Sequence, residues 1–236
     1  MTPFVSTIGV LVVAGGIITV LFRGEVRACF ERDPAARNLV EVLLTYNGLH
    51  AIIGYRIAHV LEELRVPVLP RLLMAIVRTL TGIEIHPAAT IGRGLFIDHG
   101  TGVVIGETAV IGDGVTLFQG VTLGGTGKER GKRHPTIGHR VVIGTGAKVL
   151  GHITIGDDSM IGANAVVIRS VPPHSTVVGV PGRIARTKDR DVPGINLDHT
   201  HLPDPLAERL ELLQHEIDAL ETHLKEHRRS QPETHR

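Results

Sequence analysis

Aromatic residues are scarce in this sequence. Its 236 residues include five Phe, two Tyr and no Trp, although 42% of the chain is hydrophobic. Globular cores usually bury much of their apolar area in aromatic rings, so this core must be built from Ile, Val, Leu and Ala. Small branched residues punctuated by 28 glycines predict thin, repeated layers instead of an ordinary globular core.

Two further scarcities exclude whole classes of protein. The single cysteine, Cys29, excludes an intrachain disulfide framework and a cysteine-rich zinc site. Neither sign of charge prevails, because 25 Lys and Arg stand against 24 Asp and Glu. A net charge of +1 gives no strong field for the phosphates of nucleic acid, so we expect no nucleic-acid partner.

Charged side chains are also absent from residues 1–22. The apolar part, 3–22, has about the 20 residues that a bilayer span needs, but it lacks the basic region of a secretory signal. Arg23 and Arg27 follow it and would hold the rest of the chain on the cytoplasmic side. A membrane helix, a buried helix and translated sequence upstream of the true start all stay open. We expect a cytoplasmic protein that contacts a membrane only if this leader inserts.

Residues 23–82 predict a helical domain of three or four packed helices. Asp33-Pro34 is typical of an N-cap followed by proline at the first helical position. Asn47-Gly48 is expected to end that helix. Two more helices are expected over 50–64 and 69–80, where apolar residues recur at helical spacing.

Residues 83–185 repeat with a period of six. Neither an α-helix nor an amphipathic strand has this period, whereas a short strand followed by a tight turn does. Three such units close a triangular coil of about 18 residues, and stacked coils share one aliphatic core. The predicted core positions are Ile85, Ile91, Ile97, Val103, Ile105, Ile111, Leu117, Leu123, Ile137, Ile143, Val149, Ile155, Ile161 and Val167. Small residues expected where coils crowd are Ala89, Ala109, Ala147, Ser159 and Ala165.

A charged insertion interrupts the repeat at residues 125–135. Such an insertion must leave the prism as an exposed loop, and function concentrates in loops of this kind. Its glycines and Lys128 are similar to a phosphate-cradling loop, but the spacing and the following helix of a P-loop are missing.

The polar tail, 186–236, contains a second pattern. Asp204-Pro205 predicts a helix start. The apolar residues that follow alternate spacings of four and three, as in a coiled coil: Leu206, Leu210, Leu213, Ile217, Leu220 and Leu224. A lone helix of this kind is unstable in water, so the tail is expected to pair with copies of itself. Folding back onto the helical domain is the alternative.

Several acids, bases and cations stand at the edges of this aliphatic rod. They are Glu84, Asp98-His99 and Arg133-His134. A histidine near an acid can be a general base at pH 7, although an isolated histidine is more often a solvated turn residue. The histidines of the repeat lack close ligand spacing, so no metal is expected. Cys29 has no neighbouring histidine and is more typical of a packed thiol than of a nucleophile.

The repeat and a set of local strings resemble bacterial serine O-acetyltransferases, of the left-handed parallel β-helix acyltransferase superfamily, over about residues 24–183. The resemblance implies an α+β fold: an α-helical domain, then a left-handed parallel β-helix, to which our tail prediction adds a C-terminal coiled-coil helix. The carrying strings are Arg32-Asp33-Pro34-Ala35, Gly48-Leu49-His50-Ala51, Tyr55-Arg56-Ile57-Ala58-His59, Ile85-His86-Pro87-Ala88-Ala89, Asp98-His99-Gly100-Thr101-Gly102, Gly106-Glu107-Thr108, 121–128, Arg133-His134-Pro135 and 178–183.

The resemblance also implies the reaction and the roles of individual residues. His99 is the general base on the serine hydroxyl, which attacks the thioester of acetyl-CoA directly, without an acyl-enzyme. Glu84 orients His99, at a position where the enteric enzymes carry Asp. Asp33 and Asp98 hold the substrate ammonium.

The same resemblance implies that Arg133 and His134 hold the serine carboxylate. Acetyl-CoA, the co-substrate, is expected in a groove between neighbouring prisms, so a trimer is the expected working unit, alone or as a dimer of trimers. The expected acetyl-CoA contacts are Gly125, Thr126, Thr145 and Ala163.

Two further family properties carry over less directly. Enteric members end in an isoleucine that docks into O-acetylserine sulfhydrylase, the next enzyme of cysteine synthesis, whereas this chain ends in His235-Arg236. The resemblance therefore does not extend that complex to this chain. Feedback inhibition by cysteine is implied by the family and cannot be deduced from these residues.

Two other functions stay open on the residues alone. An acetyltransferase acting on a different hydroxyl or amine, such as that of a sugar, would have no use for Asp33 and Arg133 as holders of a zwitterion. A non-catalytic β-helix scaffold, assembled through its tail, would tolerate the loss of His99.

Overall fold

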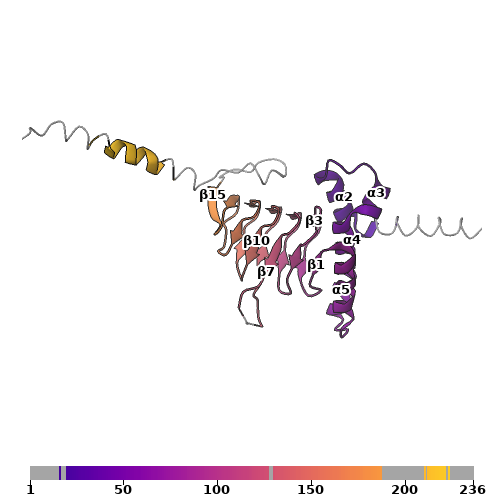
Figure 1. The fold of residues 1–236 in the computed structure, drawn as a ribbon. Coiled ribbons are helices and arrows are strands. Elements are labelled where there is room, and N and C mark those ends of the chain that lie inside the picture. The colour runs from indigo at the N-terminus through magenta and orange to yellow at the C-terminus, as the bar shows by residue number, and fades with distance from the viewer. Residues whose placement is uncertain are drawn as a thin grey trace, which may run out of the picture. The chain divides into compact units, whose positions relative to one another are not determined.

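A computed structural model describes residues 16, 20–127, 130–187, 210, 212–221 and 223. These belong to two compact units that divide after Leu202. The first unit contains helices followed by a stack of β-coils (Figure 1). Most of the apolar leader lies outside the described residues. Among the helices that are described, none is long and apolar enough to cross a membrane.

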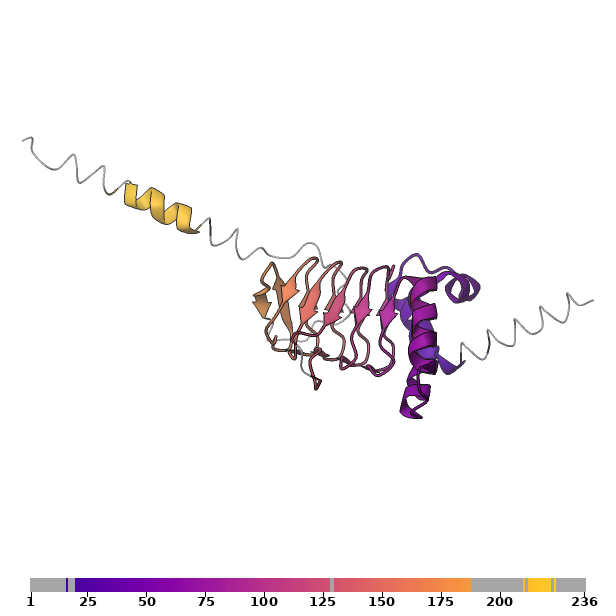
Figure 2. The ribbon, with the colours of Figure 1, turned by 60° about the horizontal axis from the view of Figure 1, so that its bottom comes forward.

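Four helices fill the predicted helical region and cover one end of the stack (Figure 2). They are α2 (Arg23–Arg32), α3 (Leu39–Thr45), α4 (Asn47–Glu63) and α5 (Leu69–Thr81). The predicted stop of the last helix is confirmed, because Gly82 follows α5 in a left-handed conformation, with φ of +74°. Helix α4 begins three residues before the predicted start, because Asn47 and Gly48 form its first turn.

The predicted N-cap at Asp33 is wrong. Asp33 lies at the C-terminal end of α2, and its carboxylate accepts hydrogen bonds from Ala35 N, at 2.7 Å, and from the Tyr46 hydroxyl. Hydrogen bonds of an Asp carboxylate to local donors compete with helix capping, and these two donors keep Asp33 in a turn. Asn38 caps α3 instead, accepting from Glu41 N at 2.9 Å.

The β-helix has three sheets, in which successive coils contribute one strand to each. The first sheet contains β1 (Glu84–Ile85), β4 (Val104–Ile105), β7 (Thr122–Gly124), β10 (Lys148–Leu150) and β13 (Val166–Val167). The second contains β2 (Thr90–Ile91), β5 (Val110–Ile111), β8 (Thr136–Ile137) and β11 (Thr154–Ile155). The third contains β3 (Phe96–Ile97), β6 (Thr116–Leu117), β9 (Val142–Ile143), β12 (Met160–Ile161), β14 (Ser175–Val178) and β15 (Arg183–Thr187). All pairs are parallel except β14 with β15.

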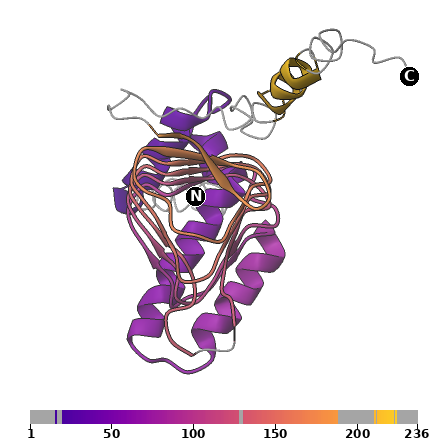
Figure 3. The ribbon, with the colours of Figure 1, turned by 90° about the vertical axis from the view of Figure 1, so that its left-hand side faces the viewer.

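The coils enclose a single aliphatic core, and Figure 3 shows them stacked behind one another around it. Every predicted core position, from Ile85 to Val167, is at most 6% exposed. The predicted small residues are buried too, at 1% or less. The six-residue period is therefore confirmed. Phe96 is buried in a separate cluster with Val26 and Cys29 of α2, so its ring fills the space between helix and β-helix and not the prism.

Hydrogen bonds from three helical side chains attach the helices to the first coils. Tyr55, fully buried, donates its hydroxyl to Ala89 O at 2.6 Å. Arg32 donates to Val115 O at 3.0 Å, and Arg56 to Ile91 O at 2.6 Å. Since each acceptor is a backbone carbonyl, these contacts fix the register of the helices on the β-helix.

The charged insertion lies between β7 and β8 and extends away from the coils (Figure 1). This confirms the predicted loop, of which Lys128 and Glu129 lie outside the described residues. In the second unit, residues 212–221 are helical. The described residues of the predicted seam, Leu210, Leu213, Ile217 and Leu220, are exposed. Pairing of this helix with copies of itself stays a prediction.

Gly48 tests the contact between α4 and β3. A Cβ at this position would lie 2.1 Å from Ile97 O, so Gly48→Ala must push the helix away from the strand. We expect it to lower the free energy of unfolding by about 1–3 kcal/mol, as measured by chemical denaturation. The matched control is Gly24→Ala in α2, where a Cβ meets its nearest neighbour at 3.6 Å. Equal stability of the two variants would contradict the contact.

Candidate functional site

The predicted site residues lie along two edges of the β-helix, which bound the first sheet. The His99 edge follows the strands of the third sheet: Asp98 and His99 come after β3, Thr145 after β9 and Ala163 after β12. The His134 edge follows the strands of the first sheet and contains Glu107, after β4, Gly125 and Thr126, after β7, and Arg133 and His134, which end the loop.

Strand register aligns the residues of the His99 edge. Ile97, Leu117, Ile143 and Ile161 occupy equivalent positions in successive coils of the third sheet. Two residues beyond them, His99, Gln119, Thr145 and Ala163 therefore form one row. Neighbouring members of the row are one strand spacing apart, about 4.8 Å. The row combines the predicted base with two of the predicted acetyl-CoA contacts.

His99 has an uncommon backbone conformation. Its φ is +56°, in the left-handed region, where a residue other than glycine is usually strained. Its side chain is 72% exposed, and its Nε2 lies 3.9 Å from Oδ1 of Asp98. Arg140, Asp158, Asn164 and His174 share this conformation, so it does not by itself distinguish His99. An exposed imidazole next to a carboxylate is able to accept a proton from a substrate hydroxyl.

Asp33 and Asp98 lie on the same side of the molecule, near Cys29. Burial, and after it the charge of Asp33 with a smaller effect of Asp98, raises the pKa of the Cys29 thiol to about 11. The thiol is therefore protonated at neutral pH, as expected of a packed cysteine. Burial and the hydrogen bond to Asp33 likewise raise the pKa of Tyr46. The end of α2 and the end of β3 thus place the two predicted ammonium ligands within electrostatic reach of the same thiol, and Asp98 lies beside His99.

The His134 edge contains a cavity of about 510 Å³ between α5 and the first sheet. Arginine, histidine and glutamate side chains line it: Arg71, Arg78, Glu84, His86, Glu107, Arg133 and His134. The guanidinium of Arg133 pairs with the carboxylate of Glu107. That hydrogen bond holds the pKa of Glu107 below its ordinary value. The cavity suits a ligand with a carboxylate, because guanidinium and imidazole donors converge on it.

Glu84 lies on this cavity and not on the row of His99. Its carboxylate accepts a hydrogen bond from Arg78 Nη1 at 2.9 Å. Glu84 begins β1 in the first sheet, opposite Val104. Its predicted role in orienting His99 stays a prediction.

Two cavity residues, Arg71 and Arg78, were not predicted as site residues. Both come from α5, and only the packing of α5 against β1 brings them to the cavity. Arg71 Nη1 lies 2.9 Å from His86 Nε2. Burial, and then the charge of Arg71, lowers the pKa of His86. Glu107 was also missed as a site residue, although it belongs to the string Gly106-Glu107-Thr108.

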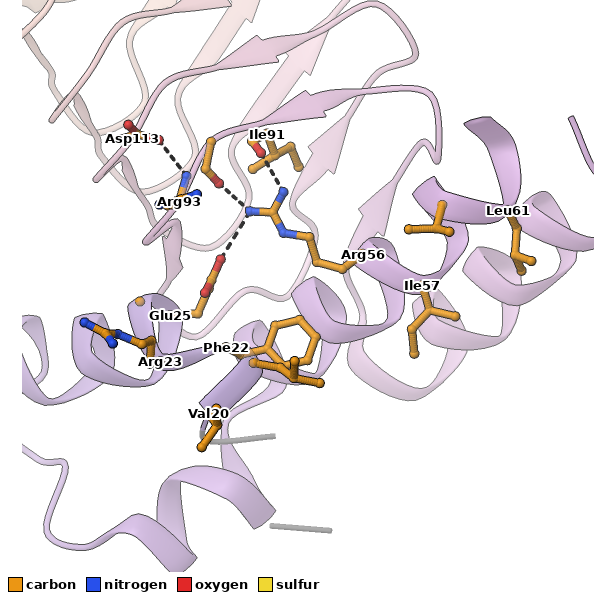
Figure 4. A pocket seen from close by; sticks show the side chains of 14 residues that line it. Val20, Phe22, Arg23, Glu25, Arg56, Ile57, Leu61, Ile91, Arg93 and Asp113 are labelled. Carbon is orange, nitrogen blue, oxygen red and sulfur yellow. Dashed lines mark hydrogen bonds and ion pairs between the residues drawn. The ribbon is translucent and has the colours of Figure 1, made fainter. Parts of the chain in front are cut away.

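A larger hollow, of about 1260 Å³, lies between the N-terminal end of α2 and α4 (Figure 4). Apolar side chains form much of its wall, among them Phe22, Ile57 and Leu61. Three of its charged side chains are engaged within the fold, because Arg56 pairs with Glu25 at 3.2 Å and Asp113 accepts from Arg93 N (Figure 4). Of these two hollows, the smaller one contains the histidines, His86 and His134. Across the part of the chain that the structure describes, no three His, Cys, Asp or Glu side chains gather as metal ligands would.

Comparison with known proteins gives consistent results. Residues 134–169 match the family described as bacterial transferase hexapeptide (six repeats). A serine acetyltransferase of Synechococcus elongatus is 55% identical over 202 residues, covering 85% of this chain and 82% of its own. The serine acetyltransferase of Bacillus subtilis is 54% identical over 206 residues, covering 87% of this chain and 94% of its own.

Solved structures agree with the sequence comparison. The serine acetyltransferase of Vibrio cholerae is 44% identical and superposes with a TM-score of 0.74, covering 79% of this chain and 72% of its own. A serine acetyltransferase in complex with cysteine is 42% identical and superposes with a TM-score of 0.75, covering 79% of this chain and 73% of its own. The serine acetyltransferase of Neisseria gonorrhoeae, in complex with serine, is 44% identical and superposes with a TM-score of 0.69, covering 72% of this chain and 70% of its own. The predicted α+β fold, with helices before a left-handed parallel β-helix, is confirmed, and the chain belongs to the serine acetyltransferase family.

Proposed function

We propose that this chain transfers the acetyl group of acetyl-CoA to the hydroxyl of L-serine, at a site shared by two neighbouring prisms. The products are O-acetylserine and CoA, and the reaction serves cysteine biosynthesis. Family membership supports the reaction. The observation that carries the shared site is the division of the candidate residues between the His99 edge and the His134 edge, on either side of the first sheet.

His99 is the general base of the proposed reaction. It removes the serine proton as the oxygen attacks the thioester carbon, and it returns that proton to the CoA thiolate when the tetrahedral intermediate collapses. The atoms balance without a covalent enzyme intermediate, in line with the protonated state of Cys29 at neutral pH. Glu84, which begins β1 of the first sheet, keeps its proposed role as the acid that orients His99.

The substrate zwitterion is held from both edges. Asp33 and Asp98 bind the ammonium group beside His99. Arg133 and His134 of the neighbouring prism bind the carboxylate. The pairing of Arg133 with Glu107 leaves further N–H donors of its guanidinium for a ligand.

Acetyl-CoA lies along the groove between the two prisms. Thr145 and Ala163 continue the row of His99 up the coils of one prism, and Gly125 and Thr126 face them from the other. A closed ring of three chains repeats this contact at every site, so a trimer is the proposed working unit. Pairing of the exposed seam in residues 210–220 would support the same symmetry.

His99→Asn tests the general base. Asparagine tolerates the left-handed backbone but cannot take up the proton, so kcat should fall by about 10²- to 10⁴-fold. CoA release, followed as free thiol, measures it. The matched control is His174→Asn, because His174 has the same conformation, with φ of +57°, at a different corner. Persistence of turnover with serine in His99→Asn would overturn the mechanism.

Arg133→Gln tests the carboxylate contact. Loss of a charged hydrogen bond should raise the KM for serine roughly 10- to 100-fold. Serinamide has no carboxylate, so the variant should also lose most of the wild-type preference for serine over serinamide. Arg169→Gln, on the exposed surface, is the control and should keep that preference. An unchanged preference in Arg133→Gln would remove this residue from the site.

Mixed oligomers test the division of the site. Co-expression of His99→Asn chains with Arg133→Gln chains should restore activity to about a quarter of that of the wild type, because random assembly gives some sites both intact residues. Each variant alone serves as the baseline. Activity of the mixture no greater than the mean of the two variants would place both residues in one chain.

A further inference from the structure

The Thr108 side chain holds the end of the charged loop. Thr108 lies at the corner after β4, and its Oγ1 lies 3.0 Å from Arg133 N and 3.1 Å from His134 N. Both backbone nitrogens are donors, so Oγ1 accepts from each. Its own proton is then available to His134 Nδ1, which is 2.9 Å away. One hydroxyl therefore contacts the backbone of both proposed carboxylate ligands and the ring of one.

These contacts select one tautomer of His134. Its Nδ1 also accepts the backbone N–H of Thr108 at 3.1 Å. A nitrogen that accepts two hydrogen bonds carries no proton, so the ring proton lies on Nε2. Around Nε2 stand two glycines, Gly106 and Gly125, where an added Cβ would lie 2.1 and 3.1 Å away. Glycine at both positions lets the ring pack closely against the backbone, and both glycines line the cavity together with His134.

We propose that Thr108 is a positioning residue that keeps His134 in the tautomer with its proton on Nε2, so that the ring donates to the serine carboxylate. The inference rests on the proposed function, from which it takes the role of His134. A neutral imidazole in the other tautomer would turn a lone pair toward the carboxylate and repel it. The choice of tautomer therefore decides whether His134 attracts the substrate.

The electrostatic surroundings make the tautomer matter. The charged and titratable groups that face His134 are Arg133 and Lys132 from the loop, Glu107 from the corner after β4, and His86 from the corner after β1. Burial, and after it the charge of Arg133, lowers the pKa of His134. The ring is 8% exposed and neutral at pH 7, so its hydrogen bond to a carboxylate depends on proton position and not on charge.

The loop end has anchors other than the Thr108 hydroxyl. Lys132 Nζ donates to the backbone oxygens of Thr108, at 2.6 Å, and of Pro135, at 3.3 Å. Thr108→Val keeps the side-chain shape and both of these contacts while it removes the hydroxyl. The variant also removes the acceptor of Arg133 N and His134 N, so the Lys132 contacts are what keep the loop end in place, and the histidine nitrogen shifts report the imidazole itself.

Nitrogen NMR of ¹⁵N-histidine-labelled enzyme, with His134→Asn for assignment, reads the tautomer directly. We expect wild-type His134 to be neutral with its proton on Nε2, and to titrate below the ordinary value of about 6.5. In Thr108→Val its pKa should rise, because one of the two hydrogen bonds that stabilise the neutral ring is gone. The backbone N–H of residue 108 still donates to Nδ1, so the Nε2 tautomer should lose population without disappearing. The KM for serine should rise about tenfold, with kcat and the KM for acetyl-CoA within about twofold.

Two further variants complete the test. Thr108→Ser keeps a hydroxyl and should restore the Nε2 tautomer and most of the serine affinity. Thr154→Val makes the same chemical change on the exposed face of β11 and should alter neither. A wild-type ring protonated on Nδ1, or unchanged nitrogen shifts and serine KM in Thr108→Val, would overturn the inference. Altered shifts with an unchanged serine KM would instead overturn the role of His134 in binding serine, and with it that part of the proposed function.

Discussion

The narrow interior of the β-helix is the constraint on which the rest of the structure depends. Each wall turns only a few small or aliphatic side chains inward per coil, such as Val103 and Ile105, and that requirement fixes which residues come next at the corner. Burial of Ile97, Ile143 and Ile161 puts His99, Thr145 and Ala163 in one row two residues later. Burial of Ile105 and Leu123 does the same for Glu107 and Gly125 on the other edge. The two rows of candidate residues are thus a by-product of core packing.

The helical domain adds what the repeat does not supply. Asp33 comes from the end of α2, and it reaches the neighbourhood of Asp98 because Arg32 is bonded to the backbone carbonyl of Val115. Arg71 and Arg78 come from α5 and give the cavity its cationic wall. A β-helix alone would offer the proposed base and the loop but only part of the set proposed to bind a zwitterion.

The sequence allowed much of this to be predicted, since a six-residue period has few physical explanations. The core positions, the loop and the end of α5 at Gly82 follow from local patterns. The turn at Asp33 did not, because its carboxylate is satisfied by Tyr46, a contact between separate elements. The same limit applies to Arg71, Arg78 and Thr108, whose partners lie 15, 6 and 26 positions away in the chain. The roles assigned to His99 and Arg133 still await their tests.

The loop between β7 and β8 also sets where the chain tolerates insertions and deletions. On one side of it Leu123 pairs with Ile105 and Val149, and on the other Ile137 pairs with Ile111 and Ile155. The strands on both sides of the loop therefore stay in register whatever the length of the loop. The entropic cost of loop closure rises only slowly with loop length. Removal of one residue within a strand would turn the aliphatic side chain that follows it in that strand away from the core. The loop can thus change in length and sequence while the scaffold that carries it stays the same.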